Sequence, residues 1–138
     1  MKVKPLTKKP KFAIREAIED IMKIIVRSDV RIGVSLSGGF DSSLLTVMAH
    51  NFYPKKICAF SVCYPDRPEN DERAKAEKLA QKLKIPFYGI EIKTKEFVND
   101  FPKMGYAMDD PIGDIAAYGY YRIMKKAREK KVSVLFKP

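Results

Sequence analysis

The chain has 138 residues, of which 46% are hydrophobic, and its formal net charge is +10 at pH 7. This length suits one compact domain and excludes two of ordinary size. No apolar run is long enough for a signal peptide or a membrane span, so we expect a cytoplasmic protein with no membrane partner. The charge attracts polyanions in general, but the basic clusters lack interleaved aromatic residues, so nucleic acid is not the expected partner.

The hydrophobic pattern alternates between helical and extended periods behind a basic lead at residues 1–10. Apolar residues at Ile14, Ile18, Ile21, Met22 and Ile25 predict an amphipathic helix over about residues 11–27. Strands are predicted at about 31–36, 56–64, 85–92 and 132–136, and further helices at about 41–51, 71–84, 95–104 and 115–130. We therefore expect a single domain over residues 11–138.

Strands with nearly continuous apolar cores, separated by helices, predict an α/β fold. Its sheet is expected to be mostly parallel and doubly wound, with helices on both faces. Ligands of such sheets bind at the carboxyl ends of the strands, near a topological switch point. The loop that follows the first predicted strand lies at such an end.

Two cysteines, Cys58 and Cys63, lie five residues apart in one predicted strand. Their side chains then point to opposite faces and are too distant to form a disulfide. The only histidine is His50, and neither cysteine has a partner at metal-ligand spacing. The pattern predicts two buried core thiols.

The loop at residues 37–43 reads Ser-Gly-Gly-Phe-Asp-Ser-Ser and joins a predicted strand to a helix. Gly38 and Gly39 allow a left-handed backbone and close approach of a ligand, while the start of the helix presents free amide groups to an anion. Ser37, Ser42 and Ser43 can donate hydroxyl hydrogen bonds to phosphate oxygens. These features predict a phosphate-binding loop.

This loop is not a Walker loop. The spacing from Gly33 to Gly38 satisfies the first part of that pattern, but Gly39 stands where it needs Lys and Phe40 where it needs Ser or Thr. Asp41 would be repelled by bound phosphates unless a divalent cation lay between them, and Mg²⁺ suits that position. The alternative is that Asp41 is a helix N-cap and the glycines form a tight turn.

The motif Ser-Gly-Gly-x-Asp-Ser after a strand resembles the PP-loop of the N-type ATP pyrophosphatases, which split ATP between its α and β phosphates. Three further blocks resemble the synthetase domain of asparagine synthetase: residues 27–36, residues 60–73, and residues 109–114, where Asp110 replaces Glu in an Asp-Glu-Pro motif. The likeness covers about residues 12–136 and implies a Rossmann-like, adenine nucleotide alpha hydrolase-like fold.

The resemblance also assigns roles to individual residues. It implies that the pyrophosphate part of ATP is held by five loop residues: Ser37, Gly38, Gly39, Ser42 and Ser43. Asp41 is the implied Mg²⁺ ligand and takes the catalytic role. Backbone at Ser35, Leu36 and Val62 would contact the adenine.

Asp110 and Asp114 are the implied substrate contacts. The carboxylates around Pro111 could instead serve only to start a helix, with Asp114 as its N-cap.

The implied reaction is attack of a carboxylate, that of aspartate in the parent family, on the α-phosphorus of ATP. Pyrophosphate leaves, and ammonia then opens the acyl-adenylate to give an amide. The implied activity is therefore that of an asparagine synthetase-like ligase with ATP and Mg²⁺ as cofactors.

Two parts of the parent family have no counterpart in the sequence. These are the amino-terminal glutaminase domain and a second Gly-rich loop, Ser-Gly-Glu-Gly-Ala-Asp-Glu, which would follow Phe136. We therefore expect a partner chain to supply the missing loop and the exposed edge after the last strand to promote self-association. Two alternatives remain, a non-catalytic nucleotide-binding module and a tRNA-modifying PP-loop enzyme.

Overall fold

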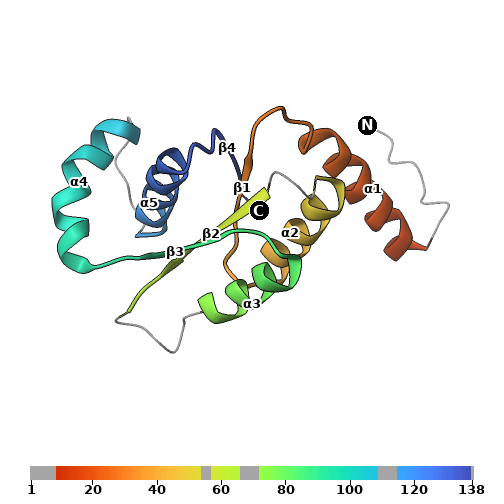
Figure 1. The fold of residues 1–138 in the computed structure, drawn as a ribbon, viewed down its shortest axis with the longest axis horizontal. Helices are drawn as coiled ribbons and strands as arrows, with labels where there is room; N and C mark the ends of the chain where they lie inside the picture. Colours follow the sequence, from red (N-terminus) through yellow and green to blue (C-terminus); the bar gives the residue numbers. More distant parts are fainter. Residues whose placement is uncertain (1–8, 54–56, 66–71, 109–114, 138) are drawn as a thin grey trace.

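The computed structural model describes residues 9–53, 57–65, 72–108 and 115–137 (Figure 1). Its helices are α1 (Pro10–Ile25), α2 (Phe40–Phe52), α3 (Arg73–Leu83), α4 (Thr94–Met108) and α5 (Ile115–Glu129). Its strands are β1 (Ile32–Ser35), β2 (Ile57–Cys63), β3 (Phe87–Glu91) and β4 (Val134–Phe136). Every predicted helix and strand is present, and α4 continues beyond its expected end at residue 104.

The strands form one parallel sheet in the order β3-β2-β1-β4. Ile32 of β1 pairs with Ile57 of β2 on one side and with Val134 of β4 on the other. The chain thus runs from β1 outward to β3 and then returns to the opposite side of β1. The predicted topological switch point therefore lies between β1 and β4, beside the loop that follows β1.

Alternate residues of the sheet pack against helices on opposite faces. Ile57 and Ala59 belong to a core shared with α1, α2 and α3, whereas Cys58 and Phe60 face a second core with residues of α5. Figure 1 shows the same division, with α1, α2 and α3 on one side of the sheet and α4 and α5 on the other. The period of two along each strand is what places a helix layer on each face.

The amphipathic helix α1 forms as predicted, but only part of its apolar stripe is covered. Met22 is 1% exposed, whereas Ile14 is 59%, Ile21 is 53% and Ile25 is 46% exposed. The predicted helix is thus confirmed, while most of its apolar stripe stays exposed. The stripe is only partly covered because α1 packs beside α2 rather than flat on the sheet. Contact with one neighbouring helix buries only a narrow strip of the surface of α1.

Both cysteines are buried and neither forms a disulfide, which confirms the prediction of two core thiols. Burial raises the pKa of the Cys58 thiol to about 11. A neutral thiol at this position is compatible with its apolar surroundings. No helix in the described ranges is both long enough and apolar enough to cross a membrane.

Candidate functional site

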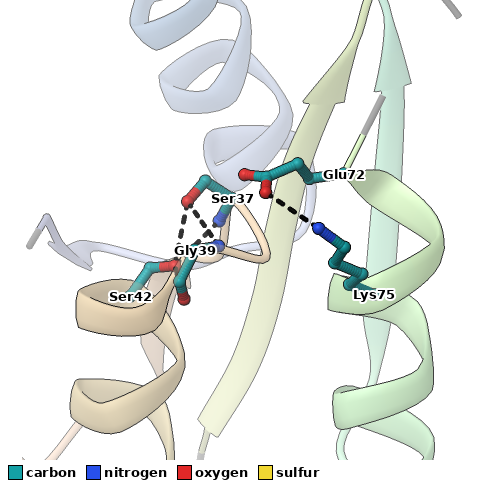
Figure 2. Close-up of polar contacts among 5 residues, drawn as sticks. All are labelled: Ser37, Gly39, Ser42, Glu72 and Lys75. Atoms are coloured by element: carbon teal, nitrogen blue, oxygen red, sulfur yellow. Dashed lines mark hydrogen bonds and ion pairs between the residues drawn. The ribbon is translucent and has the colours of Figure 1, made fainter. Parts of the chain in front are cut away.

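The loop between β1 and α2 is closed by hydrogen bonds among its own residues and with the first turn of α2 (Figure 2). The Gly39 amide donates to Ser37 Oγ at 3.2 Å, and the hydroxyl oxygens of Ser37 and Ser42 lie 2.9 Å apart. Ser42 Oγ in turn donates to the Gly39 carbonyl at 3.2 Å and accepts from the Ser37 amide at 3.3 Å. This ring of bonds holds the loop in one shape at the start of α2.

Gly38 is the position in this loop that requires glycine. Its φ angle of +93° is in the region that side chains disfavour, and a Cβ placed there would lie 2.6 Å from the carbonyl oxygen of Glu72. The loop therefore packs directly against the start of α3. Glu72 precedes α3 as its N-cap residue, so two helix starts meet at the loop.

Asp41 lies in the first turn of α2, where the helix dipole favours a carboxylate. The N-cap position belongs to Gly39, so the alternative interpretation of Asp41 as the N-cap is wrong. The Asp41 side chain is exposed beside the loop. An exposed carboxylate there fits Mg²⁺ bound chiefly by phosphates and water, since that ion needs few protein ligands. The described ranges hold no cluster of three or more His, Cys, Asp or Glu that would form an all-protein metal cage.

A pocket of about 610 Å³ opens beside the loop at the carboxyl ends of β1 and β2. Its lining comprises Ser35, Leu36, Ser37, Ser61, Val62, Cys63, Tyr64, Glu72, Ile92, Thr94, Phe97, Ala116, Tyr118, Gly119, Tyr120 and Ile123. The volume is in the range of about 300–1,000 Å³ that is typical of small-molecule sites. The pocket thus lies at the strand ends, where the fold predicts a ligand.

Four residues that the sequence predicted for the nucleotide line this pocket, namely Ser35, Leu36, Ser37 and Val62. The Leu36 amide already donates to the Phe60 carbonyl at 2.8 Å, so this N–H is not free to meet a base. The other predicted residues, Gly38, Gly39, Asp41, Ser42 and Ser43, lie in the adjoining loop and the first turn of α2. Asp110 and Asp114 lie outside the described residues.

Ser61 is a pocket residue that the sequence reasoning missed. The residue is 2% exposed, and its hydroxyl oxygen has no hydrogen-bond partner among the residues that the structure describes. A buried hydroxyl without a partner is costly, so it favours a polar ligand atom at the pocket floor. The signal available in the sequence was a lone serine within the apolar strand β2.

A family model described as asparagine synthase matches residues 13–137. The chain belongs to the asparagine synthase family. It is 35% identical over 116 residues to asparagine synthetase 1 (glutamine-hydrolyzing) of Bacillus subtilis, a match that covers 84% of this chain. The same match covers 18% of that relative, so the chain spans less than a fifth of its length.

Solved structures share the fold of this asparagine synthase family member at lower identity. The glutamine-dependent NAD+ synthetase of Acinetobacter baumannii, in complex with ADP, has a TM-score of 0.60 at 20% identity over 96% of this chain and 26% of that chain. The U34-tRNA thiolase NcsA of Methanococcus maripaludis has a TM-score of 0.56 at 16% identity over 89% of this chain and 45% of that chain. These likenesses confirm the predicted Rossmann-like α/β fold.

Helices α4 and α5 form one wall of the pocket in this family member, here called the far wall. A polar network between the two helices holds this wall together. Arg122 donates to Glu96 Oε2 at 2.6 Å and to the Tyr118 hydroxyl oxygen at 2.9 Å. The Tyr118 hydroxyl donates to Asp100 Oδ2 at 3.1 Å. Burial raises the pKa of Tyr118, and the hydrogen bond from Arg122 lowers the pKa of Glu96. The network fixes Tyr118, whose fully buried side chain lines the pocket.

Proposed function

We propose that this chain binds ATP in the pocket and loop described above and uses it to activate a carboxylate by adenylation. One observation carries the proposal: Ser37 both closes the Gly-rich loop after β1 and lines the pocket. A ligand with an aromatic body in the pocket and a polyphosphate over the loop would fill both. Membership of the asparagine synthase family supports this assignment.

The nucleoside would occupy the strand ends. The Leu36 carbonyl and the backbone of Val62 would contact the edge of the adenine ring, since the Leu36 amide is paired with Phe60. Ser61 Oγ, which has no partner within the described ranges, would gain a hydrogen bond from the ligand. The apolar and aromatic side chains of α5 that line the pocket suit the flat face of a base.

The polyphosphate would lie over the loop and the start of α2. Amide groups of the first turn and the hydroxyl of Ser43 are the groups proposed to meet phosphate oxygens. Asp41 would hold Mg²⁺, which supplies positive charge to the pyrophosphate portion of ATP. Gly38 lets the backbone approach a phosphate without an intervening side chain.

In the proposed reaction, a carboxylate oxygen of the substrate attacks the α-phosphorus, the bond between the α and β phosphates breaks, and pyrophosphate leaves. Ammonia then attacks the acyl carbon, AMP leaves with the electrons of the carbon–oxygen bond, and the excess proton passes to solvent. The chain contributes by orienting the two reactants and stabilising the charge on the leaving pyrophosphate. Aspartate is the proposed carboxylate, and a partner chain is proposed to complete the site.

The decisive experiment measures pyrophosphate release from Mg·ATP with aspartate and ammonia, using the chain alone and then with candidate partner proteins. Release that requires aspartate supports the proposal, and Asp41→Asn should abolish it. If ATP binds but no pyrophosphate is released in any combination, the chain is a nucleotide-binding module and the proposed ligase reaction is contradicted. Failure to bind ATP would sink the whole proposal.

A further inference from the structure

The start of α3 packs against the backbone of the phosphate-binding loop. The Cβ atoms of Glu72 and Lys75 lie 3.1 and 3.3 Å from the position that a Cβ on Gly38 would take. Glu72 Oε2 lies 3.9 Å from the corresponding position on Gly39. The first turn of α3 therefore faces the backbone that is proposed to hold the polyphosphate.

An ion pair lies at the start of α3, between Lys75 and Glu72. Lys75 Nζ lies 3.2 Å from Glu72 Oε1, and Figure 2 shows the lysine side chain reaching from α3 toward the carboxylate on the loop side of the helix. The side chains of Lys75 and Glu72 are 71% and 45% exposed. Such an exposed pair is weakly held, so the ammonium group can exchange its partner when a stronger anion arrives.

The loop itself supplies no cation, because residues 37–43 contain neither Lys nor Arg. ATP brings several negative charges to this place, and cleavage between its α and β phosphates concentrates charge on the leaving pyrophosphate. A nearby ammonium group would offset that charge. Lys75 meets the requirement, since its Cβ adjoins Gly38 and its flexible stem is long enough to turn toward the loop.

We propose that Lys75 binds the β and γ phosphates of ATP, and that Glu72 holds its ammonium group beside the loop until the nucleotide arrives. This inference rests on the proposed function, whose phosphate site it completes from α3. It makes Lys75 a determinant of affinity for the polyphosphate and leaves recognition of the nucleoside unchanged.

The test compares ATP with AMP, which has no β or γ phosphate. Dissociation constants for both nucleotides are measured by isothermal titration calorimetry with the full chain at low salt. For Lys75→Ala we expect ATP affinity to fall by about tenfold, with AMP affinity changed less than about twofold. Lys75→Arg should retain ATP affinity to within about threefold, because it keeps the charge at this position.

Lys82→Ala is the matched control. Lys82 lies two turns further along α3 than Lys75, on the same side of the helix and about 10 Å away along its axis. The substitution Lys82→Ala removes the same charge as Lys75→Ala. We expect it to bind both nucleotides like the wild type. If Lys75→Ala binds ATP as tightly as Lys82→Ala, or loses ATP and AMP equally, the inference is overturned while the proposed function stands. A wild-type chain that binds neither nucleotide overturns both.

Discussion

The two walls of the pocket are built in different ways. The PP-loop wall is closed by the hydroxyls of Ser37 and Ser42, five residues apart in the sequence. The far wall, formed by α4 and α5, depends on hydrogen bonds between residues distant in the sequence. Asp100 and Tyr118 are 18 residues apart, and Glu96 and Arg122 are 26 residues apart. One wall is local and the other exists only after two helices have packed together.

This difference determines what disturbs each wall. The loop shape depends on backbone conformation, so we expect it to respond sharply to a change at Gly38. The far wall depends on side-chain hydrogen bonds near the surface, so its individual members should contribute less. Three predictions, from the largest expected effect to the smallest, test this comparison.

The first prediction concerns Gly38→Ala. The new Cβ would meet the Glu72 carbonyl oxygen, and alanine would have to hold a φ angle of +93°. We expect a loss of about 2–3 kcal/mol in the free energy of unfolding together with weaker ATP binding. Urea unfolding and calorimetric titration with ATP measure the two effects.

Gly105→Ala is the control for that substitution. Gly105 lies within α4, and among the described residues no atom apart from its chain neighbours and the nearby backbone of α4 lies within 4 Å of a Cβ built there. We expect it to stabilise the fold by about 0.5–1 kcal/mol, since alanine favours the helix. Equal loss of stability from both glycine substitutions would contradict the special role of Gly38.

The second prediction concerns Arg122→Ala in the far wall. Its side chain is 17% exposed and bonds both Glu96 and Tyr118, so removal leaves these groups without its hydrogen bonds. We expect a loss of about 1–2 kcal/mol in the free energy of unfolding. The nearby Lys125→Ala, which removes a 54% exposed ammonium group 3.9 Å from Asp100, should change it by less than about 0.5 kcal/mol. Equal effects of the two substitutions would show that positive charge, and not the part-buried hydrogen bonds of Arg122, holds the wall.

The third prediction concerns pH. The hydrogen bond from Arg122 lowers the pKa of Glu96 below its ordinary value of 4.5. Ionised Glu96 therefore stabilises the fold above about pH 4.5, and this contribution is lost as pH falls through the lowered pKa. The stability gap between wild type and Glu96→Gln should stay constant from pH 7 to 5 and close on further acidification. Urea midpoints across this range measure it, and a gap that widens in acid would reverse the assigned sign.

The spacing of apolar residues along the chain predicted most of the helices and strands, because it depends only on which face of each element is buried. The apolar runs of β1 and β2 could be recognised as strands since both faces of each are buried. The end of α4 was placed too early. Pro102 disfavours a helix interior, but buried Met104 packs with Ile92 and Tyr118 and anchors the next turn, a contact that no local pattern reveals.

The residues of the candidate site also fall into two groups, those recognisable from local sequence and those brought together by packing. The glycines and serines of the loop were recognisable because they are contiguous and their chemistry is local. Glu72 entered the sequence analysis only as part of the block at residues 60–73 that resembles the synthetase domain, and Lys75 had no distinguishing signal at all. Their place against Gly38 depends on how α3 packs beside the β1–α2 loop, which the sequence pattern does not specify.

The sequence by itself determined the elements, the parallel α/β class and the PP-loop, because hydrophobic period and turn chemistry are properties of neighbouring residues. Only the tertiary structure decided which part of the α1 stripe is covered and that Lys75 and Glu72 face the loop. It also decided that the Ser61 hydroxyl is buried with no hydrogen-bond partner in the described part of the chain. Those features arise where separate elements meet, and their geometry is set by packing.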